Sequence, residues 1–365
     1  MGVTKSPSLN ILVVGAGAIG SFVGGSLAAA GHQVTLLGRR PLMDTIQSAG
    51  LTLRWPDGSV QTSSPSTATA LDDLSPPYDF ILLTVKTPDV AVALEQLASR
   101  AALAADAHIV TLQNGIGSEE QVAPVFGPER VIAGAITIPI QAPAPGVIEV
   151  SKTKGGLGLA PVQPDQPVKR LADALDQAGL TTATYTDYRA MKWSKLLLNI
   201  VNNAASAILD LPPADLIART DLFELEIGAL REAVTVMKAH GLEAVKLPGY
   251  PVDWLARLVG AGWLPPAVAR SILRPFMLSG RGTKMPSLQL DLAAGRSTSE
   301  IEALNGAIVR AGQSVGVATP INRALTDILT GLVSGELAWV DYQQKPATLL
   351  AAVEAGRQAQ HIRSK

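Results

Sequence analysis

The sequence predicts an α/β domain followed by an all-α domain. Two observations carry this prediction. Short apolar segments bordered by glycine and proline recur in the first half of the chain, and from residue 188 on the apolar residues follow helical spacing in long segments. The 365 residues suffice for two domains that each have a core. We therefore predict one domain over residues 1–187 and a second over residues 188–365.

Residues 11–40 show a strand, a glycine-rich turn, a helix and a second strand in succession. The four parts are an apolar strand, the turn, a helix of small residues and another apolar strand, at Ile11–Val14, Gly15–Gly20, Ser21–Ala30 and Gln33–Leu37. This order is typical of a Rossmann-type domain, in which the N-terminus of the helix faces the pyrophosphate of a dinucleotide. We therefore predict a dinucleotide-binding site at the turn.

The turn has the spacing G-x-G-x-x-G, with glycines at Gly15, Gly17 and Gly20. Gly15 permits the tight turn, Gly17 lets the backbone approach the pyrophosphate, and Gly20 lets the helix pack close to the strand. Ala18 and Ile19 complete the predicted cofactor-binding turn. A purely structural glycine turn is the alternative, and the complete pattern around it favours binding.

The residues after the second strand indicate which dinucleotide binds. A site that prefers NAD offers Asp or Glu there, whereas this chain has Leu37-Gly38-Arg39-Arg40. A guanidinium suits the 2′-phosphate of NADP(H), so we predict NADP(H) as the cofactor, with Arg39 in contact with it. The alternative is that both arginines belong to a solvated loop.

The composition narrows the class of partner. The formal net charge is −1, which does not favour binding to nucleic acid or to a membrane surface, so we expect a small molecule. The chain has no cysteine and only four scattered histidines, which argues against thiolate catalysis and against a metal site. We see no export signal and no apolar run that could span a bilayer, and we expect a cytoplasmic protein.

The remaining segments extend this plan. Further strands are predicted in the first domain, with a hairpin around Pro56-Asp57-Gly58, at 51–53, 60–62, 80–85, 109–112, 131–133, 147–150, 156–159 and 182–185. Helices are predicted at 90–104 and 168–178, and in the second domain at 191–209, 222–240, 300–314 and 321–334. Leu247–Ser279, rich in proline, tryptophan and leucine, is interpreted as two short amphipathic helices.

Two polar residues follow strands of the predicted sheet, where ligands of open α/β sheets bind. Lys86 lies in Val85-Lys86-Thr87, and its ammonium could meet a phosphate, a ribose or a carboxylate, although a solvated loop lysine is nearly as consistent. Asn114 lies in Gln113-Asn114-Gly115-Ile116-Gly117. Its amide can bind cofactor or substrate, and turn geometry alone is the alternative.

A second polar group lies on the first predicted helix of the second domain. Lys195, Asn199 and Asn203 recur every four residues, so they share one face of a leucine-rich helix. Asparagine is a poor helix former, and polar side chains in such a helix need polar partners. We predict that this face binds a ligand, with a buried polar network as the alternative.

Several motifs together resemble those of the ketopantoate reductases. In the family's order they are GAGAIG at Gly15–Gly20, the basic strand end, VKT at Val85–Thr87, QNGIG at Gln113–Gly117, WSKLLLN at Trp193–Asn199 and PSLQLDLAAGRSTSEIEALNG at Pro286–Gly306. The resemblance covers residues 11 to about 332. It implies NADPH-dependent reduction of ketopantoate to (R)-pantoate on a Rossmann domain joined to a helical domain similar to that of 6-phosphogluconate dehydrogenase.

The resemblance also implies roles for individual residues. Lys195 would be the catalytic lysine and Glu300 its carboxylate partner. Lys86 and Asn114 would lie beside the cofactor, and a homodimer would form through the helical domain. The substrate would be held by Asn114, Asn199, Asn203 and Ser287. For Glu300, a solvated carboxylate in the first turn of a helix is the alternative.

Other features leave the substrate and the class of protein open. The segment before Glu300 is one residue longer than the family's usual AGRPTEID, Lys284 stands where well-studied members have asparagine, and Leu247–Ser279 looks like an insertion. Reduction of another branched 2-oxo acid and a non-catalytic, NADP-binding regulatory protein are therefore the alternatives. Tyr188 and Lys192 form the Y-x-x-x-K of short-chain dehydrogenases, but the glycine spacing differs from that family's.

Overall fold

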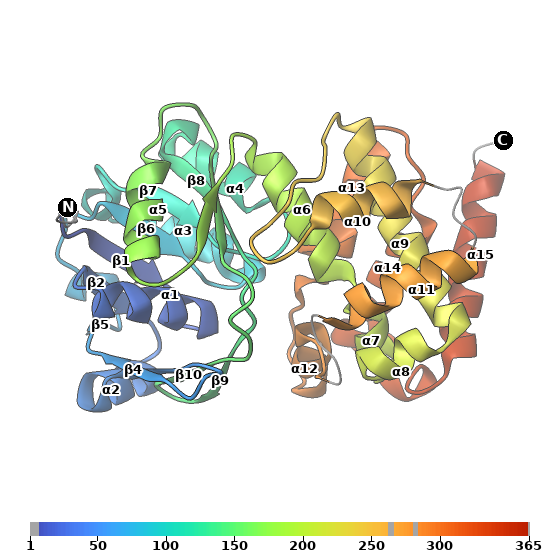
Figure 1. The fold of residues 1–365 in the computed structure, drawn as a ribbon, viewed down its shortest axis with the longest axis horizontal. Helices are drawn as coiled ribbons and strands as arrows, with labels where there is room; N and C mark the ends of the chain where they lie inside the picture. Colours follow the sequence, from blue (N-terminus) through green and yellow to red (C-terminus); the bar gives the residue numbers. More distant parts are fainter. Residues whose placement is uncertain (1–6, 262–265, 280–283, 364–365) are drawn as a thin grey trace. The chain divides into compact units, whose positions relative to one another are not determined.

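The structure is a computed structural model that describes residues 7–261, 266–279 and 284–363 (Figure 1). It divides into two compact units. Unit 1 consists of Met1–Gln113, Gly117–Lys192 and Leu247–Tyr250, and unit 2 of Asn114–Ile116, Trp193–Lys246 and Pro251–Lys365. Unit 1 is mixed α/β and unit 2 is helical. The predicted fold class is thus confirmed, and each unit is described below by itself.

Unit 1 is built on an eight-stranded sheet. In order across the sheet, its strands are β12 (Thr182–Thr184), β11 (Leu157–Pro161), β8 (Val131–Ile136), β7 (His108–Thr111), β6 (Phe80–Leu83), β1 (Asn10–Val14), β2 (Gln33–Leu37) and β5 (Ser66–Ala68). All neighbouring strands are parallel except β11 and β8. The strands predicted at 80–85, 109–112 and 131–133 thus continue a parallel sheet, whose strand order reverses at β1, and β11 adds an antiparallel pairing with β8.

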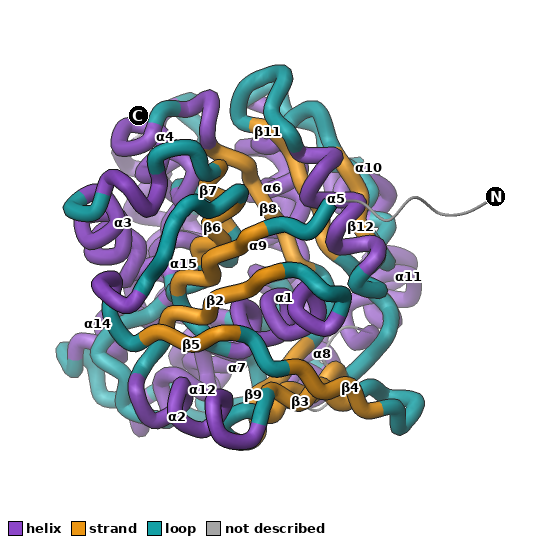
Figure 2. Tube along the Cα trace, turned by 90° about the vertical axis from the view of Figure 1, so that its left-hand side faces the viewer, coloured by secondary structure: helices purple, strands orange, loops and turns teal. Residues whose placement is uncertain are grey.

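Helices cover both faces of this sheet (Figure 2). Successive side chains of a strand point to opposite faces, so Ile11 and Val13 pack with α1 (Ala18–Ala29) and α5 (Val168–Gln177), whereas Leu12 and Val14 pack with α3 (Val90–Ala98) and α4 (Ser118–Phe126). Both faces of β1 are buried, which explains its uninterrupted apolar sequence.

A second, four-stranded sheet packs on α1. Its strands, in order, are β4 (Val60–Ser63), β3 (Leu51–Arg54), β10 (Val147–Val150) and β9 (Ile140–Ala144). The predicted hairpin is confirmed, since β3 and β4 are antiparallel. A Cβ on Gly24 would press against Leu36 of the large sheet, and one on Gly25 against Leu51 of the small sheet. The small residues of α1 thus permit packing between two sheets. The helix α2 (Arg40–Ala49) follows β2.

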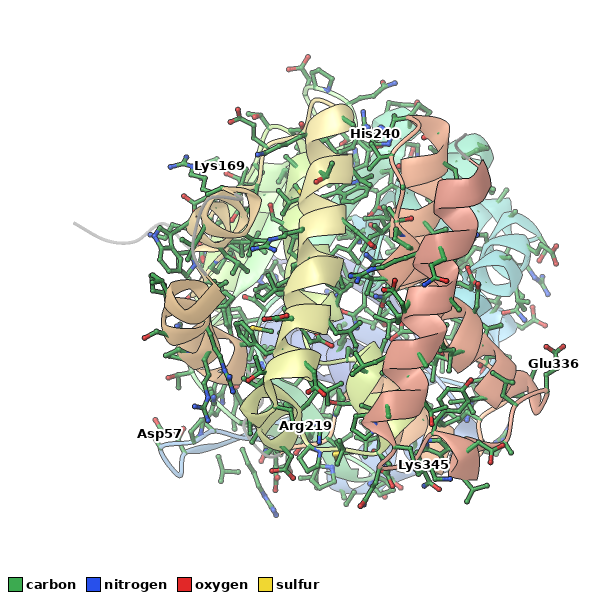
Figure 3. The ribbon with its side chains drawn as sticks, turned by 90° about the vertical axis from the view of Figure 1, so that its right-hand side faces the viewer. Asp57, Lys169, Arg219, His240, Glu336 and Lys345 are labelled. Atoms are coloured by element: carbon green, nitrogen blue, oxygen red, sulfur yellow. The ribbon has the colours of Figure 1, made fainter. Side chains whose placement is uncertain are left out.

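Unit 2 is a group of helices around α9, which runs from Arg219 to His240 in Figure 3. Its helices are α6 (Tyr188–Ile200), which begins in unit 1, α7 (Ala204–Leu209), α8 (Pro213–Ala218), α9 (Thr220–Ala239), α10 (Val252–Gly260), α11 (Pro266–Ser279), α12 (Ser287–Ala293), α13 (Asn305–Ser314), α14 (Pro320–Ser334) and α15 (Pro346–Arg363). In the described part of the chain, no helix is long and apolar enough to cross a bilayer.

Three predicted helices are interrupted. The segment predicted at 90–104 ends as α3 at Ala98, and a short 3-10 helix, η3 (Ala101–Ala104), follows. The segment predicted at 191–209 breaks between α6 and α7, where Asn202 adopts a φ of 54° and its N–H donates to Glu226 Oε2 at 2.7 Å. Asn203 therefore precedes α7 and does not continue the face of α6. The segment predicted at 300–314 opens as a short 3-10 helix, η5 (Glu300–Ala303), before α13.

The segment Leu247–Ser279 contains two short helices, α10 and α11, as predicted. Residues 262–265 of this segment lie outside the described residues. Leu247–Tyr250 belongs to unit 1, where Pro248 O accepts a hydrogen bond from Thr137 Oγ1 at 2.9 Å.

Candidate active site

The glycine-rich turn joins β1 to α1 at the carboxyl end of the parallel strands. Gly15 has a φ of 103°, in the region that favours glycine, and its N–H donates to Leu37 O of β2 at 3.0 Å. On the other side, the Thr84 hydroxyl just after β6 donates to Gly15 O at 2.6 Å. The turn is thus fixed between the ends of both neighbouring strands, where open α/β sheets bind ligands.

The space around Gly17 is open, whereas the space around Gly20 is filled. A Cβ on Gly20 would collide with Gly15 O, whereas a Cβ on Gly17 would meet no atom of the described chain within 4 Å. Gly17 immediately precedes α1, whose N-terminus is not capped by any side chain of the described residues. Backbone N–H groups of the first turn around Ala18 and Ile19 therefore lack helical partners. The open space at Gly17 and these donors fit a pyrophosphate.

Arg39 lies next to this turn. It is exposed and directly precedes α2. A Cβ on Gly38 would lie 3.0 Å from Ala16 Cβ, so the end of β2 packs against the glycine-rich turn. The chemistry of this edge, with two arginines and no carboxylate directly after β2, fits a phosphate.

The loops after β6 and β7 lie at the same carboxyl edge of the sheet as the glycine-rich turn. A Cβ on Gly15 would lie 2.7 Å from Val85 N, and the exposed Lys86 follows Val85. At the end of β7, Gln113 Nε2 donates to Leu83 O at 2.7 Å and to Val85 O at 3.1 Å. The structure thus brings the glycine-rich turn, Arg39 and the Lys86 loop together in unit 1. Sequence reasoning missed Gln113, although its place beside Asn114 after an apolar strand is a usable signal.

Three predicted residues meet in unit 2. Asn199 Nδ2 donates to Asn114 Oδ1 at 3.2 Å, and Asn203 Nδ2 donates to Asn199 O at 3.1 Å. Asn199 and Asn203 are 6% and 2% exposed. Asn203 Oδ1 is buried and has no hydrogen-bond partner in the described chain. Because leaving a buried acceptor unsatisfied is costly, this oxygen is suited to a donor group of a ligand.

The segment that carries Glu300 packs against the Asn114 loop. Ile116 N donates to Ala303 O at 3.2 Å, and a Cβ on Gly115 would collide with the same oxygen. The φ of 84° at Gly115 also favours glycine. Glu300 is buried at 8% exposure in η5. The alternative of a solvated carboxylate is therefore wrong for Glu300.

Lys195 and Ser287 lie on elements that adjoin this cluster. Lys195 is half-buried on α6, four residues before Asn199 and hence on the same helical face. Ser287 is exposed at the start of α12. Gln289 Nε2 of α12 donates at 2.8 Å to Asp210 Oδ1, just after α7. The helices that carry these predicted residues thus lie within one unit.

Tyr188 and Lys192 do not form the tyrosine–lysine pair of short-chain dehydrogenases. Lys192 Nζ lies 3.0 Å from Glu119 Oε1, and the Tyr188 hydroxyl is hydrogen-bonded to Glu120 Oε1 at 3.2 Å. Burial, and after it the Glu120 carboxylate, raises the pKa of Tyr188 to about 12. Both residues are thus held by carboxylates of α4, an arrangement that does not fit this alternative.

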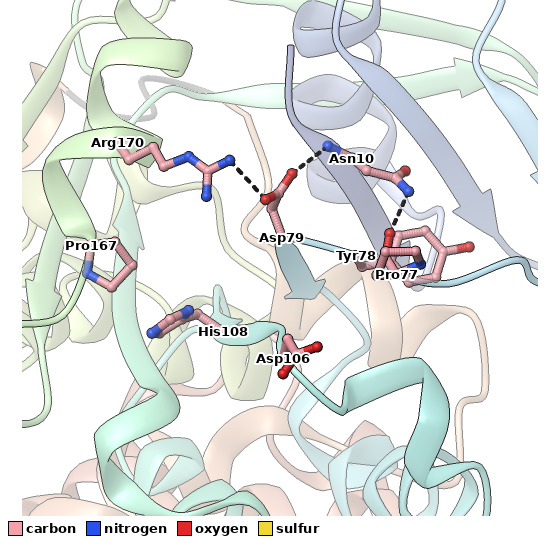
Figure 4. Close-up of a pocket in the computed structure, with 8 residues that line it drawn as sticks. All are labelled: Asn10, Pro77, Tyr78, Asp79, Asp106, His108, Pro167 and Arg170. Carbon is pink, nitrogen blue, oxygen red and sulfur yellow. Dashed lines mark hydrogen bonds and ion pairs between the residues drawn. The ribbon is translucent and has the colours of Figure 1, made fainter. Parts of the chain in front are cut away.

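A separate cavity of about 320 Å³ lies at the amino ends of β1, β6 and β7 (Figure 4). Asp79 lines this cavity and accepts hydrogen bonds from Asn10 N at 2.8 Å and from Arg170 Nη2 at 2.7 Å. Burial, followed by the charges of Arg130 and Arg170, lowers the pKa of His108. The glycine-rich turn follows the carboxyl end of β1, so the cavity is not part of the predicted cofactor edge.

Two family models match the chain. The model described as "Ketopantoate reductase PanE/ApbA" matches residues 11–163, and the model described as "Ketopantoate reductase PanE/ApbA C terminal" matches residues 187–333. A curated relative, the 2-dehydropantoate 2-reductase of Halobacterium salinarum, is 29% identical over 328 residues, which cover 88% of this chain and 98% of the relative.

Solved structures agree with this assignment. The PanE/ApbA family ketopantoate reductase from Ralstonia eutropha has a TM-score of 0.74 at 27% identity, covering 90% of this chain and 99% of its own. D-mandelate dehydrogenase, solved with NADH and anilino(oxo)acetate, has a TM-score of 0.73 at 23% identity with the same coverage, which is a likeness of fold alone. The resemblance seen in the motifs is confirmed, and the chain belongs to the ketopantoate reductase family.

Proposed function

We propose that this protein reduces the 2-oxo group of ketopantoate to (R)-pantoate with NADPH, a step of pantothenate and coenzyme A biosynthesis. Membership of the ketopantoate reductase family supports an oxidoreductase. The observation that carries the proposal is the cluster that links Asn114, Asn199 and Asn203, in which the buried Asn203 Oδ1 has no hydrogen-bond donor among the described residues.

We infer that NADP(H) is held by unit 1. The open space at Gly17 and the uncapped N-terminus of α1 would take the pyrophosphate. Arg39 would bind the 2′-phosphate, and Lys86 would lie beside the nicotinamide half. Asn114, which belongs to unit 2, is assigned to the cofactor by the family resemblance alone. We propose correspondingly that residues 1–187 serve the cofactor, and that residues 188–365 serve the substrate and a homodimer contact.

The asparagine cluster supports a hydroxylated substrate. Asn203 Oδ1 can accept a hydrogen bond from a hydroxyl group, and ketopantoate carries one whereas 2-oxoisovalerate does not. Asn199 and Ser287 would bind the remaining polar groups of the acid without adding charge. A site that hydrogen-bonds a substrate hydroxyl discriminates strongly against an analogue without it, because its own polar atom then stays unsatisfied.

The proposed reaction assigns separate tasks to the polar residues. When bound, NADPH would supply a hydride for the 2-oxo carbon. The Lys195 ammonium donates a hydrogen bond to the 2-oxo oxygen, stabilises the negative charge that develops there and then transfers a proton to it. The buried Glu300 carboxylate orients this ammonium. Hydride and proton together convert the ketone to the alcohol.

NADPH oxidation, followed by absorbance, tests the proposal. Ketopantoate is compared with 2-oxoisovalerate and other 2-oxo acids, and NADH serves as the control cofactor. We expect kcat/KM for ketopantoate to exceed that for 2-oxoisovalerate by about 100-fold or more. Turnover of only another branched acid would keep the mechanism and replace the substrate. Tight NADPH binding without any turnover would favour the non-catalytic alternative.

The presence of Lys284 supports the alternative that the substrate is another branched 2-oxo acid. It is exposed three residues before Ser287, on the segment that leads into α12. An ammonium there would favour an acid with an additional negative charge. Comparing branched 2-oxo acids that carry one or two carboxylates in the assay tests this alternative.

A further inference from the structure

Unit 1 contains a buried ion pair that the proposed reaction does not use. Lys192 Nζ lies 3.0 Å from Glu119 Oε1, and the two side chains are only 2% and 1% exposed. Lys192 lies on α6, three residues before Lys195, whereas Glu119 lies in the first turn of α4. The pair therefore joins the helix that carries Lys195 to the helix that begins just after Gly117.

The Lys192 ammonium has further acceptors just after β7 and on β8. Besides the Glu119 carboxylate, it donates to Gln113 O at 3.0 Å, and Gly134 O of β8 lies at 3.4 Å. An ammonium has three N–H donors, so this set uses all of them. The Thr111 hydroxyl of β7 donates to Glu119 Oε1 at 2.5 Å. The arrangement is specific to an ammonium and a carboxylate at these positions.

A buried ion pair of this kind adds little to the free energy of unfolding of a protein. The loss of hydration of two buried charges offsets much of their attraction, and a well-packed apolar pair often gives equal or greater stability. An apolar side chain cannot, however, donate a hydrogen bond to a carbonyl oxygen. What Lys192 adds is the directed hydrogen bond to Gln113 O.

That hydrogen bond acts on both loops that carry predicted binding residues. Gln113 directly precedes Asn114, so holding its carbonyl fixes the start of the Asn114 loop. The Gln113 side chain in turn donates to Val85 O, and Val85 directly precedes Lys86. Lys192 thus reaches Asn114 through Gln113, and it reaches Lys86 through Gln113 and Val85.

We propose that Lys192, neutralised by Glu119, is a positioning residue that holds the Gln113–Asn114 and Val85–Lys86 backbones in the geometry needed for binding. The inference rests on the proposed function, which assigns Asn114 and Lys86 to cofactor and substrate. Neither Lys192 nor Glu119 contacts the reacting atoms in this proposal.

The test separates positioning from stability by comparing a single and a double variant. Lys192→Met leaves the Glu119 carboxylate buried without its cation, so Tm is expected to fall. Lys192→Met/Glu119→Gln removes both charges, and its glutamine can still accept the Thr111 hydrogen bond. We expect Tm to recover in the double variant. We expect the Kd for NADPH, measured by nucleotide fluorescence, and the KM for ketopantoate to stay raised about tenfold, with a smaller change in kcat.

A matched control removes an ion pair of the same kind from the surface of unit 1. Lys169 Nζ lies 2.6 Å from Asp173 Oδ2, with the two side chains 84% and 43% exposed. Lys169→Met/Asp173→Asn is expected to leave Tm, Kd and KM unchanged. It shows whether loss of a lysine charge from unit 1 affects binding by itself.

Recovery of both Tm and NADPH affinity in the double variant would overturn the proposal, because the pair would then be structural only. The Kd for NADPH does not depend on turnover. If the unaltered protein reduces no 2-oxo acid, the proposed function fails, and the comparison of Kd values still tests the role of Lys192.

Discussion

Lys195 is the single residue on which the proposed chemistry depends most. It lies half-buried on the α6 face that also carries Asn199. We predict that Lys195→Ala lowers kcat about 1,000-fold, within the usual range for loss of a general acid, and changes the Kd for NADPH only a few-fold. Steady-state kinetics and nucleotide fluorescence measure the two effects, with Lys169→Ala as the control. Survival of turnover in Lys195→Ala would mean that another group supplies the proton.

Arg39 decides the choice between NADPH and NADH in this account. A charge-assisted hydrogen bond to the 2′-phosphate contributes about 1.5–3 kcal/mol. We predict that Arg39→Ala raises the KM for NADPH about 10- to 100-fold and leaves the KM for NADH unchanged. NADH serves as the internal control, because it lacks the 2′-phosphate. An equal rise for both cofactors would show that Arg39 acts on the fold of the turn.

At the scale of elements, substitutions of Gly17 and Gly20 at the start of α1 distinguish an effect on packing from an effect on cofactor binding. We predict that Gly17→Ala keeps the Tm of the unaltered protein but weakens NADPH binding about tenfold or more, because its Cβ would enter only the space assigned to the pyrophosphate. Gly20→Ala is expected to lower Tm, because its Cβ would collide with Gly15 O. Thermal unfolding and nucleotide titration of both variants check this. Unchanged NADPH affinity in Gly17→Ala would contradict the assigned cofactor position.

The junction of α9 and α14 gives a prediction on pH. Glu232 accepts hydrogen bonds from Ile321 N and Asn322 N, each at 2.9 Å, and burial raises the pKa of this carboxyl above its ordinary value of 4.5. The folded state therefore holds the proton more tightly than the unfolded state. The stability gained from this protonation is complete below pH 4.5 and is lost as pH rises through the raised pKa.

Urea unfolding of the unaltered protein and of Glu232→Gln across this pH range measures the effect. We predict that the free energy of unfolding of the unaltered protein falls relative to the variant as pH rises, by at most about 1.4 kcal/mol per pH unit. A relative increase with rising pH would mean that the hydrogen bonds outweigh burial at Glu232.

Elements with a strong local signal were predictable, and elements defined by distant partners were not. The boundaries of β2 and β10 are those expected from their apolar sequences. The strand β9 was missed because its residues are mostly exposed and include Ala and Pro, and it forms by pairing with β10. The helix α6 ends close to the contact between Asn202 and Glu226, a residue of α9. The sequence around Asn202 does not predict this contact.

At the scale of the whole molecule, the motifs predicted more of the site than the spacing of residues alone. Helical periodicity grouped Asn199 with Lys195, but only the family resemblance connected them to Asn114, Ser287 and Glu300. The structure then joined Asn114 to Asn199 by a hydrogen bond. The Lys192–Glu119 pair was not predicted, because its partners are far apart in sequence and meet only when the sheet of unit 1 forms.

The proposed function of the whole molecule is a hydride transfer, and one isotope experiment tests it most directly. The protein is incubated with ketopantoate and NADPH deuterated at both C4 positions, and the product is analysed by chiral chromatography and mass spectrometry. We predict (R)-pantoate that carries one deuterium at C2. Absence of pantoate, or formation of pantoate without the label, would contradict this prediction.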